Sequence, residues 1–530
     1  MLEVGSVNEK NTRNILLKNV LDASIGAVIW WIVGFGFATG TSENGFIGTD
    51  RFGLMKDEFM DGSGYTYATW LFQWAFAATT ATIVSGAVAE RCTIIAYLTY
   101  SISLISFIYP VVAQVGWGGG GYMSPWLGTS DKADYFMDCG VIDFAGSGVV
   151  HMTGGVAALV GATLLGPRQS FIDGTTQTPT YGPVFQTMGT LILWFGWYGF
   201  NGGSTLYIVG YGQVAAKVMV CTTLSAACGA LSTLLVGSFI ESSAAGQTVI
   251  KLEYANNGVL AGLVSITASC AVVEPYGAVI IGVGGGVVYL FASKFIKKCG
   301  VDDVVDAFPV HGACGCYGVV MAALFATKEN YAAAYGIYEG AEDVCAGLFY
   351  GGEGKQLGAN VAFCVFVLVW TGVCSLVVFM TLKCFGVLRV SSEVEDSGMD
   401  SSEHGVSKKG SASAAGATAS VVEMAPKDSK ESTGGGGGVT VKQTGAPKGP
   451  SFSSTDSMAP TGASTKKGKA KAPSFSSTDK IPEKDKKGKP VKAPSFSSTD
   501  SLPAKGANKS PEKAKVGAKI SNTRKLGSAV

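Results

Sequence analysis

The chain has 530 residues, of which 47% are hydrophobic and only 15% are charged. Soluble domains carry about 25% charged residues, so this composition excludes an ordinary soluble protein and favours one built into a membrane. The formal net charge of +1 averages two unlike regions, because residues 406–530 hold 23 Lys and Arg against 9 Asp and Glu, while residues 1–405 are acidic overall.

Ten apolar runs follow one another along the acidic region. A helix needs roughly 20 apolar residues to cross the hydrocarbon core. Runs of this kind lie at 20–40, 66–90, 92–115, 144–166, 183–204, 213–239, 258–274, 275–296, 308–327 and 359–385. The two runs that meet at Glu274-Pro275 could also be one long broken segment. Closely spaced glycines at 258–262 and 282–286 let helices approach each other. The sequence therefore predicts an all-α polytopic membrane protein, a packed bundle of ten transmembrane helices.

The Lys and Arg residues of the connections predict the orientation. One side collects eleven: Lys10, Arg13, Lys18, Arg91, Arg168, Lys251, Lys294, Lys297, Lys298, Lys383 and Arg389. The other side collects five: Arg51, Lys56, Lys132, Lys328 and Lys355. We expect the first side, with both termini, to be cytoplasmic. Cys139 and Cys345 then fall in loops on the opposite side, where a disulfide between them is possible, whereas most other cysteines lie in apolar runs as small buried residues.

The residues from 406 onward have the composition of a disordered tail. The segment Pro-Ser-Phe-Ser-Ser-Thr-Asp occurs there three times, at 450–456, 473–479 and 494–500, among lysines. Two interpretations remain open, a flexible linker with duplicated sequence or a phosphorylatable tail that docks on a kinase or on anionic lipid. Nucleic acid is not an expected partner of a tail tethered to a membrane bundle.

Two of the three histidines, His151 and His311, lie in the middle of apolar runs. Ionisable groups inside a membrane are costly and usually face a cavity or a pathway, although each could be a neutral hydrogen-bonding group between helices. Asp143 and Asp306 precede them at the expected helix starts, where a carboxylate can cap exposed amides. No set of nucleophile and base, metal-ligand cluster or phosphate-binding Gly-rich loop is present, so neither an enzyme, a cofactor nor a nucleotide-driven pump is expected.

Aromatic residues recur near these positions. Phe72 and Phe76 are one helical turn apart, Trp117 ends the third predicted helix, and Phe200 precedes Ser204 by one turn. Such aromatics in membrane helices more often serve packing or interface belts than binding.

Four motifs resemble those of the ammonium transporter (Amt/Mep/Rh) superfamily. They are Phe76-Ala-Ala-Thr-Thr-Ala-Thr-Ile-Val-Ser-Gly-Ala-Val-Ala-Glu-Arg91, Asp143-Phe-Ala-Gly-Ser-Gly-Val-Val-His-Met-Thr-Gly-Gly155, Trp197-Tyr-Gly-Phe-Asn-Gly-Gly-Ser204 and Asp302-Asp-Val-Val-Asp-Ala-Phe-Pro-Val-His-Gly312. The resemblance runs from about residue 5 to 405 and is closest to the plant and algal branch, including Leu388-Arg-Val-Ser-Ser-Glu393 and Gly398-Met-Asp-Ser-Ser-Glu-His-Gly405. It implies transport of ammonium, with methylammonium as an analogue, by a homotrimer in the plasma membrane or, alternatively, an organelle membrane.

The resemblance also implies a role for each matching residue. Phe72, Trp117 and Ser204 would recruit the ammonium ion on the outside, with Asp143 supporting them from behind. Phe76 and Phe200 would form a gate, and His151 and His311 a hydrogen-bonded pair in the pore. Asp306 would be structural. Ser402 would be a regulatory phosphorylation site, or an ordinary serine in a polar segment.

Several boundaries follow from the same resemblance. We expect a transporter domain over residues 1–390, a cytoplasmic regulatory segment over 391–405 and the tail over 406–530. Residues 1–12 match the end of the first of eleven family helices, so we expect that helix to be missing, through a truncated gene model or in a real ten-helix variant. An ammonium sensor that signals through its tail and a gas channel of the Rh type are the rival functions.

Overall fold

The computed structural model describes residues 1–55, 65–176, 179–207 and 209–405. The predicted tail with its three repeats lies outside the described residues. In the described part the chain is helical, and its only β-type pairing is an isolated bridge between Cys92 and Arg389.

In the described part of the chain, seven helical segments are long and apolar enough to cross a membrane. They are Glu9–Thr39, Ile94–Trp117, Ser147–Leu165, Gly212–Ala245, Pro275–Lys298, Phe308–Phe325 and Lys355–Cys384. Three further helices, α4 (Tyr65–Ala87), α9 (Gly182–Trp197) and α11 (Leu252–Thr267), lie where the sequence predicts spans. The predicted all-α bundle is therefore confirmed, with a helix at each of the ten predicted runs.

Some of these segments contain several labelled helices. They are α2 (Thr12–Ile29) and α3 (Phe35–Thr39) in the first of the seven, and α5 (Ile94–Ser103) and α6 (Tyr109–Trp117) in the second. The other five contain one labelled α-helix each: α7 (Thr153–Leu165), α10 (Gly212–Ala245), α12 (Pro275–Lys298), α13 (Cys314–Phe325) and α16 (Lys355–Cys384). Short helices join or flank them: α1 (Leu2–Ser6), α8 (Gln169–Ile172), α14 (Lys328–Ala334), α15 (Ala341–Cys345), α17 (Ser392–Ser397) and α18 (Met399–Ser402).

Glu274-Pro275 separates two helices rather than interrupting one. The helix α11 ends at Thr267, and α12 begins at Pro275, where the fixed φ of proline suits a first helical position. The small residues predicted to allow close packing do so. A Cβ at Gly262 or at Gly282 would lie 2.2 or 2.3 Å from the carbonyl oxygen of Ser225 in α10, so α10, α11 and α12 are in direct backbone contact.

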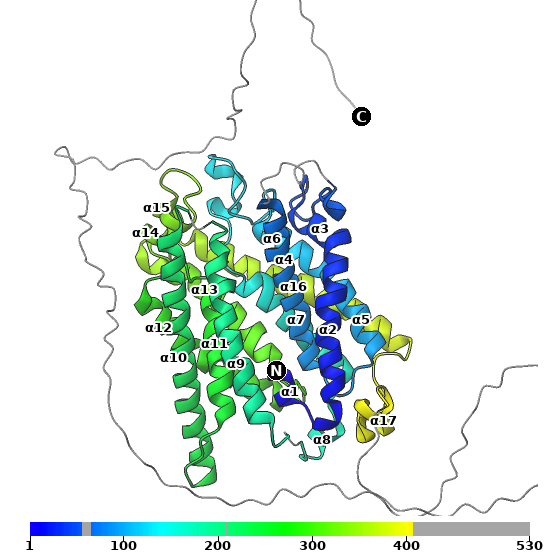
Figure 1. Ribbon diagram of the computed structural model, residues 1–530. Coiled ribbons are helices and arrows are strands. Elements are labelled where there is room, and N and C mark those ends of the chain that lie inside the picture. Colours follow the sequence, from blue (N-terminus) through cyan, green and yellow to red (C-terminus); the bar gives the residue numbers. More distant parts are fainter. Residues whose placement is uncertain (56–64, 177–178, 208, 406–530) are drawn as a thin grey trace, which may run out of the picture. The chain divides into compact units, whose positions relative to one another are not determined.

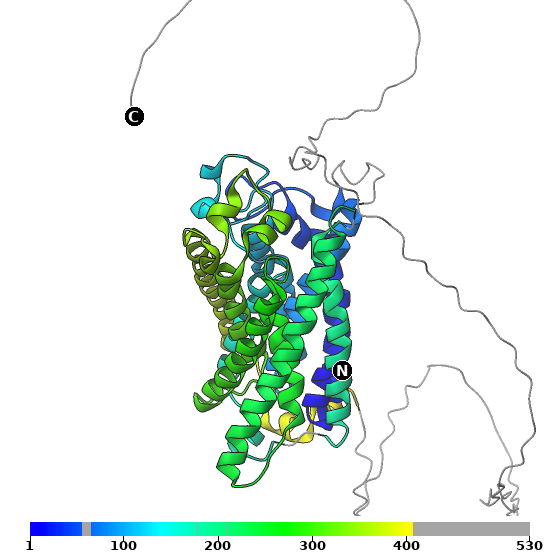
Figure 2. The same ribbon diagram turned by 90° about the vertical axis from the view of Figure 1, so that its left-hand side faces the viewer.

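The long helices stand side by side, with α8 and α17 at one end and α14 and α15 at the other (Figure 1). The turned view also places the N-terminal turns and α17 at the same end (Figure 2). Lys10, from the basic set of connections, donates to the Glu395 carbonyl oxygen at that end. Lys132 and Lys355 of the smaller set both pair with Asp138 at the other. Lys10 of the larger set and Lys132 and Lys355 of the smaller set thus lie at opposite ends of the bundle, as the sequence analysis expects.

Cys139 and Cys345 form a disulfide, with their Cα atoms 5.6 Å apart. The bond links the loop before His151 to α15, across 206 residues of sequence. The sequence left this pairing open, because loop cysteines can be placed on one side of a membrane without fixing their distance.

Candidate functional site

A pocket of about 350 Å³ brings together four of the residues singled out in the sequence. Phe72 and Phe76 line it from α4, Trp117 from the end of α6, and Ser204 from the turn that follows α9. The indole Nε1 of Trp117 donates to the Asp143 carbonyl oxygen at 2.7 Å, which fixes the plane of the ring. The Ser204 hydroxyl donates to the Phe200 carbonyl oxygen at 2.7 Å, so its lone pairs stay available to another donor.

Asp143 lies behind this pocket rather than in its wall. Its Oδ2 accepts the backbone N–H groups of Gly148 and Val149 at 3.0 and 2.8 Å, so the carboxylate caps the segment Ser147–Leu165 as the sequence analysis expects. The capped segment carries His151. Asp143 therefore contacts both Trp117, through its carbonyl oxygen, and the start of the helical segment that carries His151, through its carboxylate.

Two phenyl rings close the floor of the pocket. The Phe76 ring is only 2% exposed and meets the Phe200 ring edge to face, with ring centroids 4.3 Å apart. The Phe72 ring packs on the other side of Phe76 at 4.6 Å. The Phe76 and Phe200 rings are in contact, so a solute could pass here only if they rotate apart.

Below the rings lie the two histidines. The Nδ1 atoms of His151 and His311 are 3.2 Å apart, at hydrogen-bond distance, and one must donate while the other accepts. The His151 ring also stacks on Phe200, with centroids 5.3 Å apart. Both imidazoles line a second cavity of about 280 Å³. The two ring residues and the two histidines therefore lie between the aromatic pocket and this second cavity.

Wide π-helical turns hold three of these residues. His151 lies in Ser147–Met152, Phe200 in Tyr198–Gly202 and His311 in Phe308–Ala313. Such turns insert a residue into the helix and often mark functional positions. They redirect side chains in a way that apolar periodicity does not reveal.

Trp197 is a functional candidate that the sequence reasoning missed. Its indole stacks on the His151 ring with centroids 5.1 Å apart, and its Nε1 donates to the Thr267 hydroxyl at 2.9 Å. It opens the motif that contains Phe200, and its spacing of three residues from that ring was the available signal.

Asp303 caps the segment Phe308–Ala313, which carries His311. Its Oδ2 accepts the Phe308 N–H at 2.7 Å. Asp306, to which the sequence analysis assigns this place, instead accepts hydrogen bonds from Tyr289 and Ser293 at 2.9 and 3.0 Å. The reason is that Asp306 adopts a positive φ of 56°, which turns its side chain toward α12 and away from the helix start.

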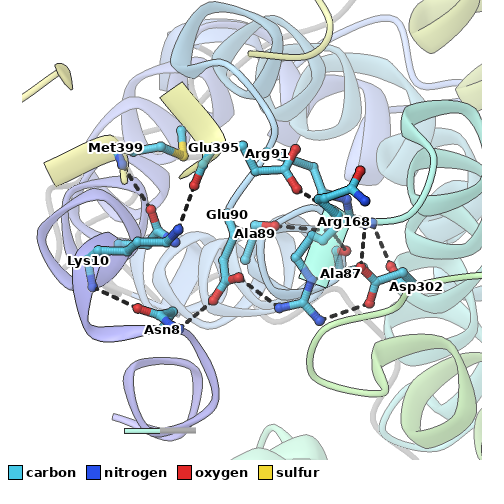
Figure 3. A network of polar contacts seen from close by, with 12 residues as sticks. Asn8, Lys10, Ala87, Ala89, Glu90, Arg91, Arg168, Asp302, Glu395 and Met399 are labelled. Atoms are coloured by element: carbon cyan, nitrogen blue, oxygen red, sulfur yellow. Dashed lines mark hydrogen bonds and ion pairs between the residues drawn. The ribbon is translucent and has the colours of Figure 1, made fainter. Parts of the chain in front are cut away.

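A buried ion-pair network lies at the end of the bundle that carries α8 and α17 (Figure 3). Arg168, 5% exposed, pairs with Asp302 at 2.7 Å and with Glu90 at 2.8 Å. Glu90 also accepts the Asn8 N–H. Burial alone would raise the pKa of the Asp302 carboxyl, but its hydrogen bonds to Arg168 and the charges of Arg91 and Arg168 hold that pKa below its usual range.

The segment 391–405 docks beside this network. Glu395 of α17 accepts the Gln169 N–H at 2.8 Å and pairs with Arg389 at 2.7 Å. Asp400 of α18 accepts the backbone N–H groups of Arg13 and Asn14, both at 2.9 Å. The hydroxyl of Ser402 donates to the Gly398 carbonyl oxygen at 3.1 Å. The segment thus contacts the starts of α2 and α8 through specific hydrogen bonds.

Among the described residues, no group of three or more His, Cys, Asp or Glu side chains could hold a metal ion. A bundle of apolar helices long enough to cross a membrane, with two hydrogen-bonded histidines inside it, defines a polytopic membrane protein.

Comparison with known proteins gives the family. Residues 1–409 match the model of the Ammonium Transporter Family, and the chain belongs to this family. It is 40% identical over 417 residues to "Ammonium transporter 1 member 1" of Arabidopsis thaliana, covering 76% of this chain and 80% of that protein. It is also 40% identical over 414 residues to "Ammonium transporter 1 member 2" of Oryza sativa subsp. japonica, with the same coverage.

Solved structures agree with this assignment. A "Sensor Amt Protein" matches with a TM-score of 0.64 and 33% identity, over 76% of this chain and 92% of that one. The Mep2 protein of Saccharomyces cerevisiae matches with a TM-score of 0.59 and 26% identity, over 72% and 80%. The chain is thus an ammonium transporter and not an enzyme, and it is a multi-pass membrane protein.

Proposed function

We propose that the chain recruits ammonium in the aromatic pocket, removes a proton from it, and conducts ammonia past the histidine pair. The observation that carries this proposal is the order of the described residues along one path: aromatic pocket, paired rings of Phe76 and Phe200, then His151 hydrogen-bonded to His311. Deprotonation is the step that makes such a path selective.

Recruitment depends on attraction between a small cation and aromatic faces. Cation–π attraction is worth roughly 0.5–2 kcal/mol per ring, and Phe72 and Trp117 both line the pocket. The Ser204 hydroxyl can accept a hydrogen bond from the ion, because its own hydrogen is already donated to a carbonyl oxygen. Asp143 supports the pocket by accepting backbone hydrogen bonds and through the contact of its carbonyl with Trp117.

The gate and the histidines then discriminate against other cations of similar size. Moving a bare ion into a low-dielectric pore costs on the order of 20 kcal/mol by an idealised Born estimate. Ammonium avoids most of this cost by releasing a proton, which K⁺ cannot do. Ammonia can pass between the Phe76 and Phe200 rings when these rotate apart, and it can then exchange hydrogen bonds with the imidazoles. The released proton crosses separately, through the histidines.

Ammonium or methylammonium uptake into cells that lack their own ammonium transporters tests the proposal. We expect saturable uptake by the wild-type chain and loss of uptake on His151→Ala at equal surface level. Uptake that persists in the variant would exclude the histidine pair from the path.

We further propose a homotrimer in the plasma membrane, with the end that carries α17 in the cytoplasm; an organelle membrane is the alternative location. The excess of basic residues in the connections at that end supports this orientation. An amino-terminal tag reached by antibody only after permeabilisation would agree with it, and a tag accessible on intact cells would not.

We propose that phosphorylation of Ser402 regulates transport, which makes a kinase a partner of the chain. We propose anionic lipid as a second partner, which would bind the basic tail. Ser402 lies in the last turn of α18, two residues after the Asp400 carboxylate that caps the start of α2. A phosphate there would place new negative charge beside that contact and loosen it. Ser402→Asp should therefore reduce transport, and unchanged transport would remove the hypothesis.

An ammonium sensor is the second candidate, supported by the long tail and by the similarity to a protein described as a sensor. Surface expression without any uptake would favour it.

A further inference from the structure

The cavity below the histidine pair holds a carboxylate that the proposed transport does not yet use. Glu3, in α1, lines the same cavity of about 280 Å³ as His151 and His311. Its Oε1 accepts a hydrogen bond from the Ser85 hydroxyl at 2.6 Å. Its Oε2 is buried and has no hydrogen-bond partner among the described residues.

The polar groups of this cavity are few and converge on it. They are the side chains of Glu3, Asn19, Thr79, Thr82, His151, Trp197 and His311. The Thr82 hydroxyl donates to the Asn19 side-chain oxygen at 3.2 Å, and the Thr79 hydroxyl to the Ala75 carbonyl oxygen at 2.8 Å. The Nε2 atom of His151 is, like Glu3 Oε2, buried without a partner in the described part of the chain.

Water can connect these two unpartnered atoms. A water molecule occupies about 30 Å³ in the liquid, and it stays in a cavity that offers it two to four polar partners. The cavity volume corresponds to several such molecules, and Glu3, His151 and His311 all line it. An unpartnered buried carboxylate oxygen is unfavourable unless something donates to it.

We propose that Glu3 is the proton acceptor below the histidine pair. This inference rests on the proposed function, in which ammonium releases a proton before ammonia passes the gate. The proton released from ammonium passes through the hydrogen-bonded imidazoles and the cavity water to the Glu3 carboxylate, which becomes a neutral carboxylic acid. Glu3 then releases it toward the end of the bundle that carries α17, where it recombines with ammonia to form ammonium. One substrate molecule and one proton are thus delivered together.

The position of Glu3 suits this role because α1 is held firmly. The side chain of Gln186 in α9 donates to the Gly5 carbonyl oxygen at 3.0 Å. A Cβ at Gly5 would lie 2.5 Å from the Gly182 carbonyl oxygen, so α1 and the start of α9 are in direct backbone contact. The carboxylate is therefore fixed at the cavity rather than carried on a loose end.

The test measures charge and substrate in the same cells. In oocytes under voltage clamp, ¹⁴C-methylammonium influx and current together give the charge moved per substrate molecule. This ratio does not depend on how many molecules reach the surface, so partial misfolding does not affect it. Glu3→Gln is the informative variant, because the amide still accepts the Ser85 hydrogen bond but cannot take up a proton at Oε2.

We expect Glu3→Gln to lower the charge moved per methylammonium molecule by about tenfold or more. The reason is that a positioned proton acceptor contributes roughly 100-fold or more to a proton-transfer step. Glu3→Asp should restore much of the ratio. The matched control is Glu9→Gln, an exposed glutamate in the next turn of the chain, which should leave the ratio unchanged.

Two results would overturn the inference: an unchanged ratio in Glu3→Gln, or wild-type influx without any current. Failure of the wild-type chain to take up methylammonium at all would instead overturn the proposed function on which it rests.

Discussion

Replacement of Gly155 by alanine tests whether the spacing of the two histidines matters. Gly155 is in α7, one helical turn after His151. It faces Gly312, the residue that follows His311. A Cβ at Gly155 would lie 2.1 Å from the Gly312 nitrogen and 2.4 Å from its Cα. Atoms of this kind are normally about 3.5–4.0 Å apart, so the two segments would have to separate by roughly 1 Å or more.

Such a separation would break the contact between the imidazoles, whose Nδ1 atoms are 3.2 Å apart. A displacement of about 1 Å in a positioned group can cost roughly 100-fold in rate, and we expect a loss of this order in the initial rate of methylammonium uptake. The matched control is Gly196→Ala in α9, where a Cβ meets nothing within 4 Å. Uptake by Gly155→Ala at the wild-type rate, with equal surface level, would refute the reasoning.

Two further predictions concern the stability of the purified protein. Arg168→Met should lower its stability by about 3–5 kcal/mol, because it leaves Glu90 and Asp302 as buried charges without their partner. Asp302 has a lowered pKa, so its ion pair contributes stability above its ordinary pKa that is lost as the pH falls through the folded-state value. The deficit of the variant, measured by melting at several pH values, should therefore shrink in acid; a constant deficit would contradict this cause. Cys139→Ser should cost about 2–5 kcal/mol by removing the bond to Cys345, and a reductant should then lower the melting temperature of the wild type only.

The apolar runs predicted the spans well because crossing a membrane imposes a length on each run. They placed the ends less well. The first run was predicted from residue 20, whereas its helix begins at Thr12, and the run at 213–239 belongs to a helix that continues to Ala245. Polar turns that extend a helix beyond the hydrocarbon carry no hydropathy signal.

The candidate site could be predicted where a motif fixes residue types, as at the histidines, but only in part where packing decides. Asp303, and not Asp306, caps the segment that carries His311, and this depends on one backbone torsion, the positive φ of Asp306. The contact of Trp197 with His151 depends on a wide helical turn. Glu3 lines the cavity next to His151 and His311 because of how α1 packs on α9, which no local sequence pattern encodes.

The most direct test of the transport path is ammonium flux in liposomes that contain the purified protein. We expect saturable flux that an equal concentration of K⁺ does not reduce, and we expect His151→Ala to abolish it. Flux that K⁺ inhibits by competition, or flux that survives replacement of both His151 and His311, would contradict conduction of ammonia through the histidine pair.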